Sequence, residues 1–154
     1  MYFFTFDKNI QIMKRLFIVA AIVIFASCSS DDDSGDVNTS EFEQVKTTLP
    51  QGKWKVSTFN DNGIDKSEEF ESFKFTFNKD GSVEAQNDLL TELGTWNYDN
   101  TSSSSEKLNL KFGEINPFDE ISDDWNIISV TNSKVELSDD DGNGDIELLT
   151  FIKL

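Results

Sequence analysis

The feature that most constrains the fold of this chain is a series of short segments rich in aromatic and β-branched residues. Apolar and polar residues alternate within the segments, and clusters of Asp, Asn, Gly and Ser separate them. Eight segments can be counted: Lys53–Phe59, Phe70–Phe77, Ser82–Gln86, Gly94–Tyr98, Lys107–Phe112, Trp125–Thr131, Lys134–Leu137 and Ile146–Lys153. Because side chains of a strand point alternately to its two faces, this pattern predicts β-strands with one buried side.

The connections between these segments predict that neighbours pair antiparallel. Asn78 to Gly81 forms a tight turn with glycine where positive φ is needed, and 131–133 and 139–145 link the last three segments. About eight consecutive antiparallel strands, each with one apolar face, can form a closed barrel or a two-layer sandwich. We expect an all-β, up-and-down barrel, because closure removes exposed strand edges.

A short helix is predicted before the first strand. Ser40 and Glu43 have capping-box spacing, Phe42, Val45 and Leu49 fall on one helical face, and Pro50 ends the run. The last segment, 146–153, carries apolar residues on both faces. We therefore expect its outer face to be covered, with the helix over 39–49 as the candidate cover.

The N-terminal region reads as an export signal. A ten-residue apolar run, Leu16–Phe25, follows Lys14 and Arg15 and ends in small residues before Cys28. It is too short to span a bilayer, which takes about 20 residues. The segment resembles a bacterial lipobox, which implies cleavage after residue 27 and lipidation of Cys28. Residues 1–12 add Asp7 and three phenylalanines before the basic pair, so we expect the true start at Met13. The alternative is an incidental thiol.

The segment 28–38 follows the cysteine and is rich in serine and aspartate. Such a composition cannot bury enough apolar surface to fold, so we expect a solvated tether. It resembles the acidic segment that follows the lipidated cysteine in Bacteroidetes lipoproteins, which implies an outer-membrane location and display on the cell surface. A plain charged spacer is the alternative. One folded domain, 39–154, remains.

Composition excludes several functional classes. The net charge is −16 and Arg15 is the only arginine, which argues against nucleic-acid binding. No histidine is present, so Ser-His-Asp and Cys-His mechanisms and His-ligated metal sites are excluded. Nothing in the sequence fixes the separation of its scattered carboxylates. We expect a non-enzymatic protein without a cofactor that meets the membrane through its lipid.

The Gly52-Lys53-Trp54 motif resembles the kernel motif of lipocalins, and Gly94-Thr95-Trp96 repeats it. The order of the later segments is similar to the small lipocalin-like domains of Bacteroidetes lipoproteins. The resemblance implies a barrel whose closed end is plugged by Trp54. It departs from true lipocalins in lacking the arginine that stacks on this tryptophan, for which Lys153 is the only late cation nearby in sequence.

Aromatic residues on the predicted strands are candidates for lining a ligand cavity, since an eight-stranded barrel either holds one small ligand or is filled by side chains. They are Trp54, Phe73, Phe75, Phe77, Trp96, Tyr98 and Trp125. Two hypotheses follow. The protein binds a small apolar or amphipathic molecule at the cell envelope, or it is a structural or protein-interaction lipoprotein with a filled barrel.

The acidic segment 139–146 contains the first half of a calcium loop. Its candidate ligands are Asp139, Asp141, Asn143 and Asp145. Thr150 stands where such a loop carries its bidentate glutamate, and helical flanks are not expected. An acidic hairpin turn is therefore the favoured interpretation.

Overall fold

The computed structural model describes residues 40–99, 107–140, 142 and 144–154. Its elements are α2 (Glu41–Thr48), β1 (Lys53–Asp61), β2 (Ile64–Asp65), the 3-10 helix η2 (Ser67–Phe70), β3 (Lys74–Phe77), β4 (Ser82–Gln86), β5 (Thr91–Asp99), β6 (Lys107–Lys111), β7 (Asp124–Thr131), β8 (Lys134–Asp140) and β9 (Ile146–Lys153). The predicted signal, Cys28 and the tether lie outside the described residues. No helix within the described part is long and apolar enough to cross a bilayer.

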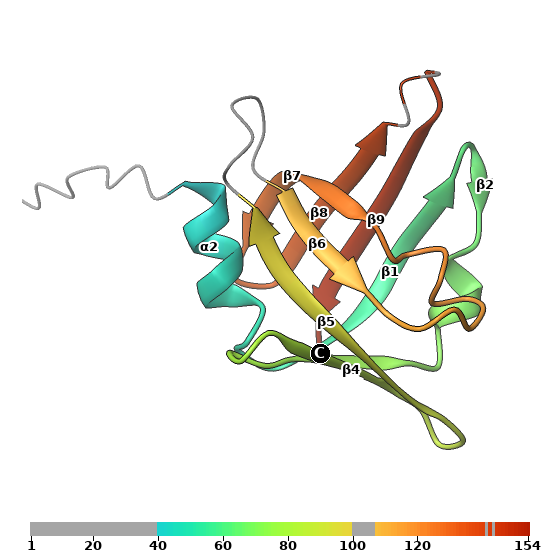
Figure 1. The fold of residues 1–154 in the computed structure, drawn as a ribbon, viewed down its shortest axis with the longest axis horizontal. Coiled ribbons are helices and arrows are strands. Elements are labelled where there is room, and N and C mark those ends of the chain that lie inside the picture. Colours follow the sequence, from blue (N-terminus) through green and yellow to red (C-terminus); the bar gives the residue numbers. More distant parts are fainter. Residues whose placement is uncertain (1–39, 100–106, 141, 143) are drawn as a thin grey trace, which may run out of the picture. The chain divides into compact units, whose positions relative to one another are not determined.

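The strands form a closed antiparallel barrel in which β3 to β9 follow one another in sequence order, each paired with the next (Figure 1). Closure comes from β1, which pairs with β3 at Trp54 and along most of its length with β9. The two-residue strand β2 is an additional strand beside the end of β1. The predicted up-and-down barrel of eight strands is confirmed, with β2 as an extra strand that the sequence pattern did not reveal.

The β3–β4 hairpin forms as its turn chemistry predicts. Gly81 has φ of 87°, a region that favours glycine, and the Asn78 amide donates to the Ser82 carbonyl oxygen at 2.8 Å. The bounds of β4 and β9 agree with the sequence prediction. Thr131 pairs with Lys134 across the β7–β8 turn, so this hairpin is confirmed as well.

The predicted second strand is too long at its start. Residues Ser67–Phe70 form η2, and the strand begins only at Lys74. The Ser67 hydroxyl accepts a hydrogen bond from the Phe59 amide at 2.8 Å, and the Phe73 amide donates to Phe70. These local hydrogen bonds pair backbone amides within a turn instead of a strand. The turn places the Phe70 ring in the buried core.

The helix α2 is capped as predicted, since the Ser40 hydroxyl accepts from the Glu43 amide at 3.4 Å. Val45 and Leu49 are fully buried. The helix packs on β7, and the expectation that it covers β9 is wrong. The inward side of β9 is the one that carries Leu149 and Phe151, while Leu148 on its outer side is 39% exposed.

Candidate functional site

The barrel interior is filled by the residues that were candidates for lining a cavity. Six of the seven are buried, and Tyr98 is partly buried against them. Phe75 is at the centre of the packing. Its ring centroid lies 5.2 Å from that of Phe151, 6.1 Å from Phe112 and 6.4 Å from both Phe70 and Phe118. Tilted and edge-on contacts at such distances are those of a packed aromatic core.

Both ends of the barrel are covered. At the end where β1 starts, Val45 and Leu49 of α2 pack into the core. At the opposite end, Phe70 of η2 and Phe118 of the β6–β7 connection are fully buried, with 6.0 Å between their ring centroids. Figure 1 shows α2 and η2 at opposite ends of the barrel. Among the described residues, side chains from both covering segments therefore belong to the same buried cluster as those of the strands.

Charged and hydroxyl side chains fix the second cover in place. The Lys66 ammonium lies 2.7 Å from a carboxylate oxygen of Asp61 and 2.8 Å from one of Glu120, so it joins β1 to the β6–β7 connection. The Ser122 hydroxyl accepts from the Phe112 amide at 2.9 Å and donates to the Phe118 carbonyl oxygen at 2.7 Å.

Each of the three tryptophans donates its indole N–H to the backbone of a connecting segment. Trp54 donates to Leu49 at 2.8 Å, Trp96 to Asn78 at 2.9 Å and Trp125 to Ile121 at 3.1 Å. In the part of the chain that the structure describes, no buried side-chain nitrogen or oxygen lacks a partner. In this part of the chain, a ligand entering the interior would therefore find no unpaired buried side-chain nitrogen or oxygen to orient it.

The two Gly-x-Trp motifs occupy positions where glycine is required. Gly52 has φ of 135°, and a Cβ atom there would lie 2.9 Å from Lys153 Cε. At Gly94 a Cβ atom would lie 2.5 Å from the Lys111 carbonyl oxygen. The Lys153 ammonium sits 5.8 Å from the centroid of the Trp54 ring, a cation–π distance.

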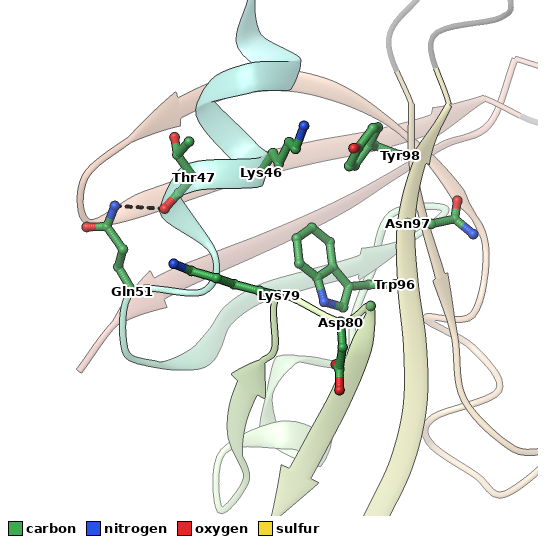
Figure 2. A pocket seen from close by; sticks show the side chains of 9 residues that line it. Lys46, Thr47, Gln51, Lys79, Asp80, Trp96, Asn97 and Tyr98 are labelled. Carbon is green, nitrogen blue, oxygen red and sulfur yellow. Dashed lines mark hydrogen bonds between the residues drawn. The ribbon is translucent and has the colours of Figure 1, made fainter.

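A groove on the outer surface, which we name the α2–β5 groove, lies between α2, the β3–β4 turn and β5 (Figure 2). Its volume is about 610 Å³. It is lined by Lys46, Thr47, Gln51, Lys79, Asp80, Gly81, Trp96, Asn97 and Tyr98. Of these, sequence reasoning singled out only Trp96 and Tyr98. Lys46, Lys79 and these rings are far apart in the sequence, and no motif marks them as neighbours.

Electrostatics in the α2–β5 groove follow from short contacts. A hydrogen bond with the Tyr98 hydroxyl, followed by the charge of Glu43, raises the pKa of Lys46. The Lys46 ammonium lies 5.2 Å from the Tyr98 ring centroid and 3.8 Å from Glu43 Oε1. Asp80 is held by the amide and the hydroxyl of Ser82 at 3.0 and 2.7 Å, which lowers the pKa of Asp80.

A second charged region involves Glu147 on β9. Burial is the largest cause that raises the pKa of Glu147 to about 7, and the charge of Asp61 and a hydrogen bond to it contribute next. Asp123 and Asp139 raise it further. Asp139 of β8 and Glu147 of β9 are directly paired across the two strands, so their carboxylates are cross-strand neighbours.

The predicted calcium ligands are only partly covered by the structure. Asp139 lies in β8 and Asp145 precedes β9, whereas Asp141 and Asn143 lie outside the described residues. Among the residues that are described, no group of three or more Asp, Glu, Cys or His side chains is arranged to hold a metal ion. The calcium loop stays a prediction.

Comparison with known proteins identifies a similar fold. A crystal structure of a DUF4847 family protein from Bacteroides vulgatus ATCC 8482 matches with a TM-score of 0.53 at 17% sequence identity, over 71% of this chain and 97% of that chain. No family model and no curated protein matches the sequence. At this identity the likeness concerns the fold alone.

Proposed function

We propose that this chain is a lipid-anchored protein of the bacterial cell envelope whose barrel is a filled, non-catalytic scaffold that works through its outer surface. The observation that carries the proposal is the packing of Phe75 against four other phenylalanine rings in the middle of the barrel. Covers at both ends and satisfied buried polar groups support it. Of the two hypotheses from the sequence, the filled barrel is the one that this packing favours.

The likeness to lipocalins is part of the same proposal. Gly52 at positive φ and Lys153 beside the Trp54 ring reproduce the arrangement that the kernel motif implies, with lysine in place of arginine. A lipocalin-like domain is usually expected to bind a ligand inside its barrel. In this chain the rings occupy that space, so we assign the domain no interior ligand.

The anchor rests on the sequence around Cys28. An apolar run, small residues, one cysteine and an acidic segment favour a lipoprotein of the outer membrane. Metabolic labelling with an alkyne-tagged palmitate should mark the wild-type chain and leave the Cys28→Ser variant unmarked. Protease added to intact cells should degrade the domain if it is displayed on the surface, and spare it if it faces the periplasm.

The filled interior can be tested with the full chain in lipid nanodiscs, titrated with dodecanoate while methyl NMR signals are followed. We expect the resonances of interior methyl groups, such as those of Leu108, Val135 and Leu149, to keep their positions, because these side chains are buried in the core. Saturable shifts of these interior methyl groups would contradict the proposal. Shifts confined to residues of the outer surface are compatible with it.

A further inference from the structure

We propose that the α2–β5 groove binds a small organic anion that carries a flat apolar group, such as an aromatic carboxylate. The inference goes beyond the proposed function, which assigns no ligand to the protein. The volume of the α2–β5 groove, about 610 Å³, lies within the range of small-molecule sites. Three separate segments form its walls: α2, the β3–β4 turn and β5 (Figure 2).

The charge of the groove differs in sign from that of the chain. Two lysines, Lys46 and Lys79, line it, although the net charge of the chain is −16. Among the described residues, no carboxylate lies within ion-pair distance of the Lys79 ammonium. Lys46 is 3.8 Å from Glu43, and both side chains are about half exposed, so this pair is weak.

The acidic residue of the groove is turned away from the lysines. In Figure 2 the Asp80 carboxylate points away from Lys46 and Lys79. Its oxygen accepts from the amide and the hydroxyl of Ser82, which hold it within the β3–β4 turn. The charge presented between α2 and β5 is therefore positive, and it is complementary to a carboxylate.

The apolar part of the groove is aromatic. The side chains of Trp96 and Tyr98 point from β5 toward α2, whereas Asn97 points to the other face of the strand (Figure 2). Asn97 accepts a hydrogen bond from Asn109 of β6 at 2.8 Å, which directs its amide oxygen toward that strand. A flat apolar group can pack against the partly buried Tyr98 ring and the small part of Trp96 that is exposed, 5% of its surface, while its acid group meets the lysines.

The walls are held in position before any ligand arrives. The Trp96 indole donates to Asn78 at 2.9 Å and the Trp96 amide to Gly81 at 2.8 Å, so β5 is tied to the β3–β4 turn. The end of α2 is tied to β1 by the bond from Trp54 to Leu49. A preformed site of this kind avoids much of the ordering cost of binding.

The test is calorimetric titration of the full lipidated chain in phosphatidylcholine nanodiscs with 2-naphthoate, with empty nanodiscs as the blank. The neutral analogue 2-naphthylmethanol has the same ring system without the charge. We expect one naphthoate per chain and an affinity about tenfold higher than that of the alcohol, because the acid makes charge-assisted hydrogen bonds. Equal affinities, or no heat above the blank, would overturn the proposal.

Variants locate the site. Lys79→Met and Lys46→Met should each weaken naphthoate binding about fivefold and leave the binding of the alcohol unchanged, as expected for exposed charges. Lys55→Met is the matched control, because Lys55 is exposed on β1 outside the groove, and it should change nothing. Full affinity in the Lys79→Met variant would overturn the proposal. The filled barrel is judged separately, from the interior methyl groups, so the two proposals fail independently.

Discussion

The indole nitrogen of Trp54 donates a 2.8 Å hydrogen bond to the carbonyl oxygen of Leu49, the C-cap residue of α2. Both residues are fully buried. The bond therefore satisfies the polar atom of one of the three buried tryptophans, and it also fixes the end of the helix that forms one wall of the α2–β5 groove. Stability and the geometry of the groove depend on the same contact.

Replacing Trp54 by Phe keeps most of the apolar contact and removes the donor. We expect the free energy of unfolding to fall by about 1–3 kcal/mol, because a buried carbonyl loses its partner and the smaller ring leaves space. Urea unfolding measures the loss. Thr58→Ser, an exposed change on the same strand, serves as the control and should stay close to wild type. Unchanged stability of Trp54→Phe would show that the bond does not support α2.

Replacing Gly94 by Ala should distort the junction of β5 and β6. The new Cβ atom would lie 2.5 Å from the Lys111 carbonyl oxygen and 2.6 Å from Phe112 Cδ1, so backbone must move. We expect a loss of about 3 kcal/mol, the upper end of the usual range for overpacking, because the contact is with backbone. Gly63→Ala is the control with open space around the new atom and a positive φ of 88°, and it should cost about 1 kcal/mol. Equal losses would contradict the close approach at Gly94.

Replacing Lys66 by Met removes the cation between Asp61 and Glu120. The two carboxylates hold the pKa of Lys66 above its usual range, so the ammonium stays charged at neutral pH. Without it, the cover formed by the β6–β7 connection loses its link to β1. We expect faster hydrogen exchange at the Phe118 and Ser122 amides, whereas Lys74→Met, an exposed change on β3, should leave them protected. The same exchange in both variants would refute the role of the cation.

Stability should depend on pH through Glu147. Burial raises the pKa of Glu147 to about 7 from an ordinary value of 4.5, so the folded state binds its proton more tightly than the unfolded state does. The contribution of Glu147 to the free energy of unfolding is therefore complete below about pH 4.5, and it is lost as the pH rises through about 7. The lowered pKa values of Asp65 and Glu136 act in the opposite sense, and only at lower pH.

The check is the urea midpoint of wild type and Glu147→Gln between pH 5 and pH 8. We expect the wild-type midpoint to fall over this range and the variant to show a flatter profile, because an amide does not titrate. Asp123, whose pKa burial also raises, is present in both proteins and does not distinguish their profiles. Parallel profiles for the two proteins would contradict the assignment to Glu147.

Much of the barrel is predictable from local pattern, because strand and turn chemistry are encoded within a few residues. Gly81 and the alternation from Phe73 to Phe77 place the β3–β4 hairpin. The cover of β9 is not predictable in this way. Leu148 and Leu149 are equally apolar, and the register of β9 against β1 and β8 is what buries Leu149 and leaves Leu148 39% exposed.

The α2–β5 groove escapes sequence reasoning for a related reason. Lys46, Lys79 and Tyr98 belong to three segments that the closed barrel brings together. Neither their spacing nor their type marks them as neighbours. The filled interior is a comparable case, since Phe118 lies in a connection without strand periodicity, yet its ring is fully buried beneath the end of the barrel.

Methyl NMR of the full chain in nanodiscs under xenon pressure can decide whether side chains fill the barrel. Xenon enters apolar cavities in protein cores and leaves packed interiors unchanged. Phe118→Ala provides the positive control, because it removes a ring that contacts Phe70, Phe73, Phe75 and Phe112. We predict saturable shifts of the interior Leu and Val methyl groups in this variant alone. Shifts of similar size in the wild-type protein would contradict the account.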